Sequence, residues 1–546
     1  MSNRTILLSL FGIILFSCSS PKPETREIRI SLATEPPTLD WNLATDNVSY
    51  QILNQLMEGL TQFDDQMNVI PAAAKSWEIT DDGKTYLFHL DSNYRWSDGK
   101  KVIAEDFRYS WLRLLRPETA AEYAYFLFDI VGARDFNSGR LREENQVGIE
   151  VIDPFTLKVS LTKPVVFFPA IATFMVTYPL RKDLFEKYGD NWTDPENMVT
   201  CGPYLLKEWW HEYRLKLEKN PLYGGSPRPA IDGITVFLVN EPATVLALYE
   251  KGELDIASPP PVALPRYKNH PDMVHAPKLR GYYYGFNTTK KPFDDVRIRQ
   301  ALAMALDKSE IPNILKGGEQ PVNSWIPPGM FGFDESIGLK FDPEKGRELL
   351  EEAGITPHPN PLPQGERGYF VESPLPRGEG VRGRVKISEI TLTFNSDPVN
   401  KKIAEWAQGQ WKKNLGIDVR LDNQEWKSYL SLLRNDPPGL FRLGWGADYP
   451  DPDNFMNLFT SASGNNHTQW KNSEFDRLIG EAATQSDGVK RKGLYDEAQK
   501  ILLERKTVIL PLFAATQNIL VREKLRPFPI IPMDFVYYKR VKFKKL

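Results

Sequence analysis

The sequence is poor in cysteine, in excess charge and in long apolar runs. Its 546 residues include only two cysteines, Cys18 and Cys201, and the formal net charge is −3. A charge balance this close to neutral gives no electrostatic footprint for nucleic acid, which needs a clustered basic face. After Cys18, the chain offers Cys201 no partner for a disulfide. We therefore expect a buried thiol there.

The motifs of common catalytic machineries are missing as well. The sequence has no His-Glu-x-x-His, no Walker A loop and no Gly-x-Ser-x-Gly elbow, and its six histidines are scattered without metal-ligand spacing. Residues 378–383 match Gly-x-Gly-x-x-Gly but follow no strand. The acidic run 448–453 lacks the glycine and glutamate of a calcium loop. We predict a protein that is not an enzyme and uses no metal or other cofactor.

The longest informative apolar stretch lies at the start of the chain. Ile6 to Phe16 follow Arg4, and this stretch is too short to span a membrane but fits a secretory signal. It ends in Leu15-Phe16-Ser17-Cys18, which resembles a bacterial lipobox with Phe16 as the departure. We predict a lipoprotein signal peptide over 1–18, a lipidated Cys18 and a tether over 19–25, the alternative being a plain cleaved signal. The rest would be periplasmic or extracytoplasmic, held to a membrane by the lipid alone.

The remaining chain mixes strands and helices. Residues 76–80 and 85–90 flank an Asp-Asp-Gly turn and predict a β-hairpin. Asp294 to Leu306 predict a helix with Asp294 as its cap. Residues 390–421 read as strand, helix and strand, with Gly416 closing the helix. Parallel strands joined by a crossover helix indicate an α/β lobe.

One segment has a different composition. Residues 357–384 hold two near-copies of a Pro-Leu-Pro-x-Gly-Glu unit between a predicted helix and a predicted strand. A tract so rich in proline and glycine cannot bury a core. We predict a mobile surface insertion, which a fold tolerates because loop-closure entropy grows slowly with length.

Seven further segments follow one another along the chain: Ser31–Asp40 with Asn42, Trp96–Gly99, Gly202–Tyr204, Tyr282–Asn287, Pro292–Arg297, Asn423–Trp426 and Gly444–Tyr449. Taken in this order, they resemble the family 5 extracellular solute-binding proteins of ABC importers, closest to the oligopeptide-binding branch. The similarity runs from about residue 28 to the C-terminus, apart from the insertion.

This resemblance implies an α/β fold of the type II periplasmic-binding-protein kind, with two hinged lobes and an extra domain. Lobe I would comprise 26–64, 200–277 and 513–546. The extra domain would be 65–199 and lobe II 278–512, with the ligand cleft between the lobes. Such proteins close around ligand by hinge motion.

The resemblance also implies a function: a monomer that captures short peptides and delivers them to the transmembrane subunits of an ABC permease. A receptor indifferent to side chains must bind the peptide backbone and the charged ends. Gly444, Trp445 and Gly446 would pair with the backbone as an exposed strand. Asp448 would bind the α-ammonium group and Arg442 the carboxylate. A turn cap at Asp448 and a structural ion pair at Arg442 are the alternatives.

Other positions match the family less specifically. Tyr123 would lie near the ligand's N-terminus and Trp426 would wall a side-chain pocket, although both could be core residues. The loop with Thr45, Asp46 and Asn47 would supply main-chain contacts, and Arg434 lies one position off a second family arginine. Two departures stand out: Arg280 and Gly446 occupy the positions of a disulfide in a related protein, and Asn400 replaces a histidine that reaches ligand carboxylates.

Several alternatives remain open. The same scaffold carries dipeptides, oligosaccharides or metal chelates in other members. A secreted peptidase is conceivable but would need a nucleophile or metal cluster, which the motif screen does not find. A lipoprotein that signals or assists folding without transport is the third alternative.

Overall fold

The computed structural model describes residues 26–355, 390–533 and 535–544. The predicted signal peptide with Cys18, the tether 19–25 and the insertion 357–384 lie outside the described residues, so these predictions stay untested. Within the described ranges, no helix is both long and apolar enough to cross a bilayer.

Lobe I is built on a four-stranded sheet that joins distant parts of the chain. Its first strand, β1, runs parallel to β10, and the other neighbouring strands are antiparallel. The order across the sheet is β1 (Glu27–Leu32), β10 (Gly233–Leu238), β9 (Arg214–Lys219) and β8 (Tyr204–Trp210). Cys201 is fully buried and unpaired, as predicted.

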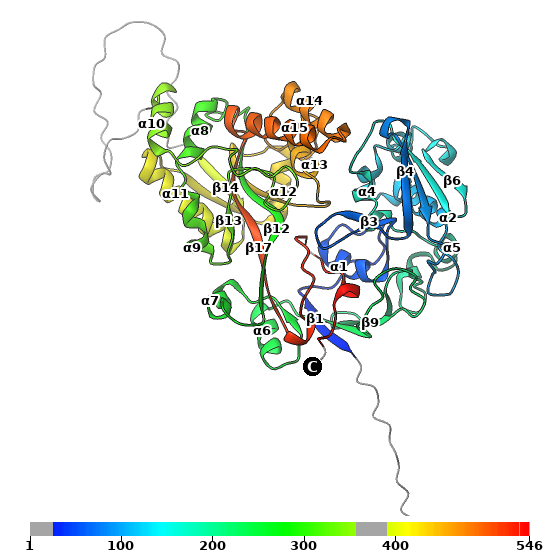
Figure 1. The fold of residues 1–546 in the computed structure, drawn as a ribbon. Helices are drawn as coiled ribbons and strands as arrows, with labels where there is room; N and C mark the ends of the chain where they lie inside the picture. The colour runs from blue at the N-terminus through cyan, green and yellow to red at the C-terminus, as the bar shows by residue number, and fades with distance from the viewer. Residues whose placement is uncertain (1–25, 356–389, 534, 545–546) are drawn as a thin grey trace, which may run out of the picture.

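The extra domain carries its own four-stranded antiparallel sheet, at the far side from lobe II's core in Figure 1. The predicted hairpin is confirmed, with Thr80 opposite Thr85. The strand order is β4 (Ala74–Thr80), β5 (Thr85–Leu90), β7 (Thr156–Ser160) and β6 (Ile149–Asp153). A small pair, β2 (Thr61–Phe63) and β3 (Val69–Pro71), connects this domain to lobe I.

A seven-stranded mixed sheet lies mainly in the range predicted for lobe II and reaches into the ranges predicted for lobe I through residues 256–257 and parts of 273–286 and 509–521. The predicted strand–helix–strand unit is confirmed, since β14 and β15 are parallel and joined by α11 (Pro398–Leu415), with Gly416 in the left-handed region at φ 67°. The sheet order is β11 (Ile256–Ala257), β17 (Ile509–Val521), β12 (Met273–Phe286), β16 (Leu440–Gly446), β14 (Thr391–Asn395) and β15 (Arg420–Gln424), and β13 (Gln320–Pro321) also pairs with β17.

Two of these strands, β12 and β17, run from one lobe into the other (Figure 1). Met273 pairs with Leu520 beside lobe I, and Gly285 pairs with Ile509 inside lobe II. The register shifts between Pro277 and Gly281, where β12 has more residues than β17. A bulge weakens the ladder and bends the strand locally. The two lobes are therefore joined by a pair of strands with a built-in point of flexure.

The predicted helix at 294–306 is shorter than expected. It forms α8 (Val296–Met304), and its cap is Asp295, whose side chain accepts a 2.9 Å hydrogen bond from the Arg297 N–H. The N–H of Asp295 itself bonds to the Pro292 carbonyl. This turn holds Asp294 outside the helix. The spacing of apolar residues alone does not show which of the two aspartates caps the helix.

Helices cover the sheets of all three parts. In lobe I and the extra domain they are α1 (Asn47–Leu56), α2 (Ala104–Leu115), α3 (Ala133–Asn137), α4 (Phe168–Ile171), α5 (Lys182–Tyr188), α6 (Pro242–Glu250) and α7 (Leu264–Tyr267). In lobe II, besides α8 and α11, they are α9 (Ile311–Leu315), α10 (Pro343–Glu352), α12 (Trp426–Asn435), α13 (Asp453–Met456), α14 (Ser473–Thr484) and α15 (Gly488–Lys500).

Candidate functional site

Strand β16 presents an open edge over its second half. On one side it pairs with β12 along its whole length, from Leu440 opposite Phe286 to Gly446 opposite Arg280. On the other side, pairing with β14 covers only Leu440 and Phe441. From Arg442 onward, β12 is the only strand partner of β16 in the described part of the chain.

The hydrogen-bonding groups of alternate residues point to this open edge. The N–H of Ala447 bonds to the Leu279 carbonyl on the β12 side, whereas the carbonyl of Arg442 accepts from the Tyr429 hydroxyl on the other side. Because backbone groups alternate along a strand, Gly444 and Gly446 direct their N–H and C=O groups away from β12.

Space at these glycines is tight. A Cβ atom at Gly444 would lie 2.9 Å from the Gly281 carbonyl oxygen, and one at Gly446 would lie 3.2 Å from Arg280 Nε. Arg280 and Gly446, the positions of the disulfide in the related protein, are direct cross-strand partners here. The Arg280 side chain therefore lies where a Cβ at Gly446 would meet it.

Asp448 follows the open edge directly. Its N–H donates to Asn454 Oδ1 at 3.1 Å, and Asn454 Nδ2 donates back to its carboxylate at 3.3 Å. The same Asn454 Oδ1 accepts a 2.9 Å bond from Trp445 Nε1. Burial raises the pKa of Asp448 to about 6, against the smaller opposing effect of the Asn454 bond. Among the residues that the structure describes, the carboxylate thus has no cationic partner to offset its desolvation.

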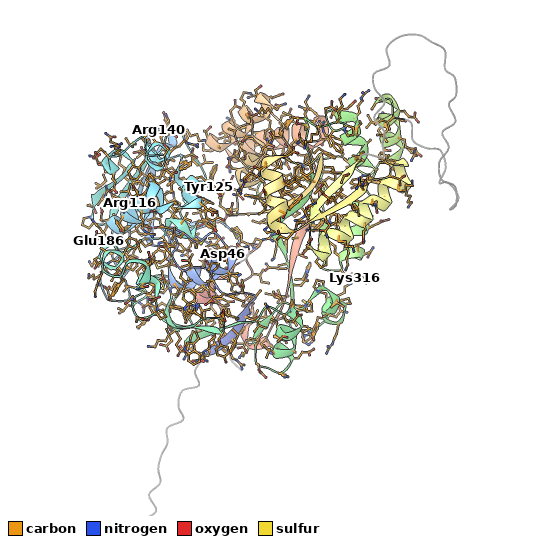
Figure 2. All side chains as sticks on the ribbon, turned by 180° about the vertical axis from the view of Figure 1, so that it is seen from behind. Asp46, Arg116, Tyr125, Arg140, Glu186 and Lys316 are labelled. Atoms are coloured by element: carbon orange, nitrogen blue, oxygen red, sulfur yellow. The ribbon has the colours of Figure 1, made fainter. Side chains whose placement is uncertain are left out.

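Tyrosines from the opposite side of the cleft face this carboxylate. Burial is the main cause that raises the pKa of Tyr123 and Tyr125 well above the usual range, and the negative charge of Asp448 is the second. The same charge is a smaller cause of the raised pKa of Tyr50, after burial and Tyr537. The Tyr123 hydroxyl donates to the Thr45 carbonyl at 3.0 Å. Figure 2 shows Tyr125 where the extra domain faces lobe II. The structure therefore brings Asp448, Tyr123 and Thr45 together, and their roles in binding a ligand stay predictions.

Arg442 lies at the other end of the open edge. Its Nη1 donates to Asn395 Oδ1 at 3.2 Å, and its guanidinium sits 4.2 Å from the Tyr282 ring centroid. Asn400, at the position of the family histidine, donates to the same Asn395 oxygen at 2.9 Å. A single amide thus orients both residues that the resemblance placed near a ligand's carboxylate.

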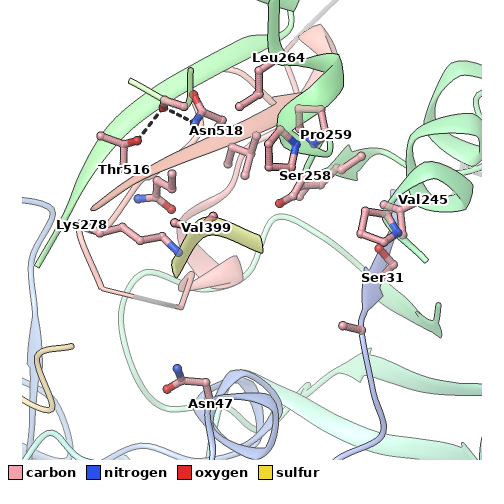
Figure 3. Close-up of a pocket in the computed structure, with 18 of the residues that line it drawn as sticks. Ser31, Asn47, Val245, Ser258, Pro259, Leu264, Lys278, Val399, Thr516 and Asn518 are labelled. Atoms are coloured by element: carbon pink, nitrogen blue, oxygen red, sulfur yellow. Dashed lines mark hydrogen bonds between the residues drawn. The ribbon is translucent and has the colours of Figure 1, made fainter. Parts of the chain in front are cut away.

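A cavity of about 1020 Å³ lies between the lobes beside β12 and β17, which we call the hinge strands. Figure 3 shows Asn47 of α1 on one side and Lys278 of β12 on the other. Lys402 and Asp397 of lobe II also line it, together with Arg280, which connects it to the end of β16. Its size suits an organic ligand rather than a single ion.

Two predicted residues lie at the margin of this arrangement. Trp426 begins α12, is 44% exposed and packs 6.3 Å from the Tyr429 ring, next to Arg442. Arg434 is exposed near the end of α12. The pKa of His467 is lowered mainly by the burial of that histidine and to a smaller extent by the charge of Arg434. Their roles remain predictions.

Three partners escaped the sequence reasoning. Asn454, Asn395 and Tyr125 carry no motif of their own, and only their positions relative to Asp448 and Arg442 mark them. Among the described residues, no three His, Cys, Asp or Glu side chains gather as metal ligands would.

Comparison with known proteins places the chain. The model for bacterial extracellular solute-binding proteins, family 5, matches residues 68–467. The oligopeptide-binding protein OppA of Bacillus subtilis (strain 168) is 33% identical over 560 residues, covering 98% of each chain. The probable deoxycholate-binding periplasmic protein YgiS of Escherichia coli (strain K12) is 31% identical over 532 residues, covering 96% of this chain and 95% of that one.

A solved structure agrees with the sequence comparisons. The unliganded open form of the periplasmic murein tripeptide binding protein MppA matches with a TM-score of 0.79 at 29% identity, over 95% of this chain and 98% of that one. The α/β fold is accordingly that of the type II periplasmic-binding-protein kind. The chain belongs to family 5 of the bacterial extracellular solute-binding proteins, near the oligopeptide-binding branch.

Proposed function

We propose that this protein captures short peptides between its lobes, by their backbone and charged ends, and delivers them to the transmembrane subunits of an ABC permease. One observation carries the proposal. Asp448, a partly buried carboxylate without a cationic partner in the described residues, stands at the end of an open strand edge and lies near Tyr123, whose pKa is raised by burial and then by the charge of Asp448.

The open edge supplies what all peptides share. Gly444 and Gly446 present backbone groups that an extended ligand can pair with, as an added strand pairs with a sheet. The absence of side chains at both positions lets another backbone approach closely. Affinity from this source is independent of ligand sequence.

The ends of the edge supply opposite charges. Asp448 suits an α-ammonium group and Arg442, oriented by Asn395, suits a carboxylate. Six residue steps separate them, which corresponds to roughly 20 Å of extended chain. A peptide of a few residues fits this span.

The opposite charges of Asp448 and Arg442 favour peptides over deoxycholate, the other ligand that the name of a relative mentions. YgiS is named for deoxycholate, an anion without an ammonium group. Such a ligand could meet Arg442 but would leave the partly buried Asp448 without an ionic partner, which disfavours its charged form. OppA and MppA are named for peptide ligands, whose amino end gives Asp448 a partner.

The remaining features of the proposal concern location and assembly. We propose a monomer without catalytic activity, anchored through lipid on Cys18 in the periplasm or another extracytoplasmic space. The apolar stretch before Cys18 and the periplasmic names of several relatives support this location.

Calorimetry with defined ligands tests the function. Tri-, tetra- and penta-alanine should bind, and their N-acetylated forms should bind about ten- to a hundredfold more weakly, because one charge-assisted hydrogen bond contributes about 1.5–3 kcal/mol. Mass spectrometry of copurified molecules should find peptides. Binding of deoxycholate in place of peptides would overturn the proposal, and cleavage of the added peptide would indicate a peptidase.

A further inference from the structure

The extra domain touches lobe II at a point far from the hinge strands. The N–H of Val166 donates to the Ala483 carbonyl at 3.1 Å, so a backbone hydrogen bond crosses between the two domains. Beside it, the rings of Phe167 and Tyr449 stack with centroids 5.4 Å apart and planes 11° from parallel. Each of these aromatic residues is only 8% exposed. This is a packed contact between the extra domain and lobe II.

The contact is continuous with the surroundings of Asp448. Tyr449 is the next residue in the chain, and its ring also packs edge-to-face with Phe126, with centroids 6.3 Å apart. Phe126 stacks on Tyr125 with centroids 4.8 Å apart, and burial and then the charge of Asp448 raise the pKa of Tyr125. The same aromatic group therefore forms the domain contact and lies close to Asp448.

The lobe II side of the contact is rigidly held. Tyr449 donates its hydroxyl to Asp453 at 3.0 Å. Arg491 makes two bonds to Asp451, at 2.7 and 2.8 Å, and a third to the Ala482 carbonyl at 2.9 Å. These bonds fix the loop after β16 and the end of α14 relative to each other. The surface that meets Phe167 is thus formed in advance, which reduces the ordering cost of contact.

We infer that Phe167 and Tyr449 form a latch between the extra domain and lobe II, which controls how often the two separate beside Asp448. The identity of the captured ligand rests on the proposed function, whereas the latch itself rests on the contact described above.

The latch has a specific kinetic consequence. A ligand whose amino end is bound at Asp448 leaves more readily when the extra domain and lobe II separate at this rim. Separation breaks the aromatic stack and the Val166–Ala483 hydrogen bond. A weaker latch therefore raises the rate at which the liganded protein opens, and hence the dissociation rate, whereas association rates change less than dissociation rates among variants of one binding site.

The decisive experiment changes one domain and observes the other. In Phe167→Ala, hydrogen–deuterium exchange in the lobe II segment around Tyr449 should become at least several-fold faster in the ligand-free protein, because the stack that covers it is lost. Trialanine should dissociate about tenfold faster in stopped-flow measurements, with association within about threefold of wild type. Phe167→Tyr keeps the ring and should restore both values.

A matched control separates the latch from general loss of stability. Leu157→Ala removes a fully buried side chain from β7, inside the extra domain. It should lower the melting temperature but leave exchange around Tyr449 and trialanine dissociation unchanged. Unchanged exchange in Phe167→Ala, or an equal change in Leu157→Ala, would overturn the latch. If wild type does not bind trialanine, the peptide proposal fails, and the exchange data still decide the latch.

Discussion

The two ends of the interlobe space differ in character. Asp448 is partly buried, has aromatic side chains nearby and accepts a side-chain hydrogen bond from Asn454. Beside the hinge, the cavity of about 1020 Å³ carries charges of both signs, among them Lys278, Lys402 and Asp397. The end at Asp448 requires a positively charged group, and the cavity beside the hinge can hold groups of either charge.

This difference suggests how a receptor combines affinity with tolerance. A buried charge without a cationic partner discriminates strongly, since the wrong ligand leaves it unpaired. A roomy cavity with groups of both signs penalises few side chains. Recognition would therefore be strict at the amino end and permissive toward the hinge.

Removing the charge of Asp448 should have the largest effect on peptide affinity. Asp448→Asn keeps the shape and the bond from Asn454 but cannot neutralise an ammonium group. Affinity for trialanine should fall about ten- to a hundredfold, and affinity for N-acetyl-trialanine should stay within about twofold. Titration calorimetry of both ligands against both proteins gives the comparison. Equal losses for the two peptides would show that Asp448 does not contact the amino end.

The pH dependence should sharpen the same contrast. Burial raises the pKa of Asp448 to about 6, so the carboxylate is mostly ionised at pH 7 and about one-tenth ionised at pH 5. Ammonium binding needs the ionised form, and peptide affinity should therefore fall about tenfold from pH 7 to pH 5.

The ligand-free protein should respond in the opposite direction. The folded-state pKa lies above the usual value, so the stability contributed by the neutral carboxyl is lost as the pH rises through 6. Asp448→Asn should melt at a higher temperature than wild type at pH 7.5 and show a flat affinity profile over the same range. A wild-type profile as flat as that of Asp448→Asn would contradict the assignment.

A smaller loss should follow from blocking the strand edge between the two ends. In Gly444→Ala the new Cβ would lie 2.9 Å from the Gly281 carbonyl, so backbone must shift. We expect a three- to tenfold loss for free and N-acetylated peptides alike, because the edge serves every ligand. Gly409→Ala in α11, where a Cβ has open space, is the control; it should leave binding unchanged and stabilise by about 0.5–1 kcal/mol. If only peptides with a free amino group lost affinity, the substitution would be acting through Asp448 and not through the strand edge.

Sequence reasoning reached the parts that depend on local pattern. Alternation and a glycine stop sufficed for the unit of β14, α11 and β15, and an Asp-Asp-Gly turn sufficed for the hairpin. Asp448 emerged from a motif match. Asn454 and Asn395 did not, because an amide acquires its role only when the fold sets it beside a particular charge.

The helix cap illustrates the same limit on a smaller scale. Asp294 and Asp295 are chemically equivalent, and only the turn closed on Pro292 selects the second. Likewise, helical periodicity could not place Arg434 relative to the cleft. Long-range register decides such matters, and a single sequence does not display it.

The smallest effect should come from the permissive end. Lys402 lines the hinge-side cavity, and Lys278 and Arg280 also contribute positive charge there. Lys402→Ala should change trialanine affinity by less than about threefold, since a short apolar peptide does not need this charge. A peptide with an acidic residue near its carboxyl end should lose slightly more, because a partly exposed ion pair contributes only about 0.2–1 kcal/mol. Raising the salt concentration to 0.5 M should erase that extra loss. A large loss for trialanine would instead show that the hinge side holds the peptide as strictly as Asp448 does, and the contrast between the two ends would disappear.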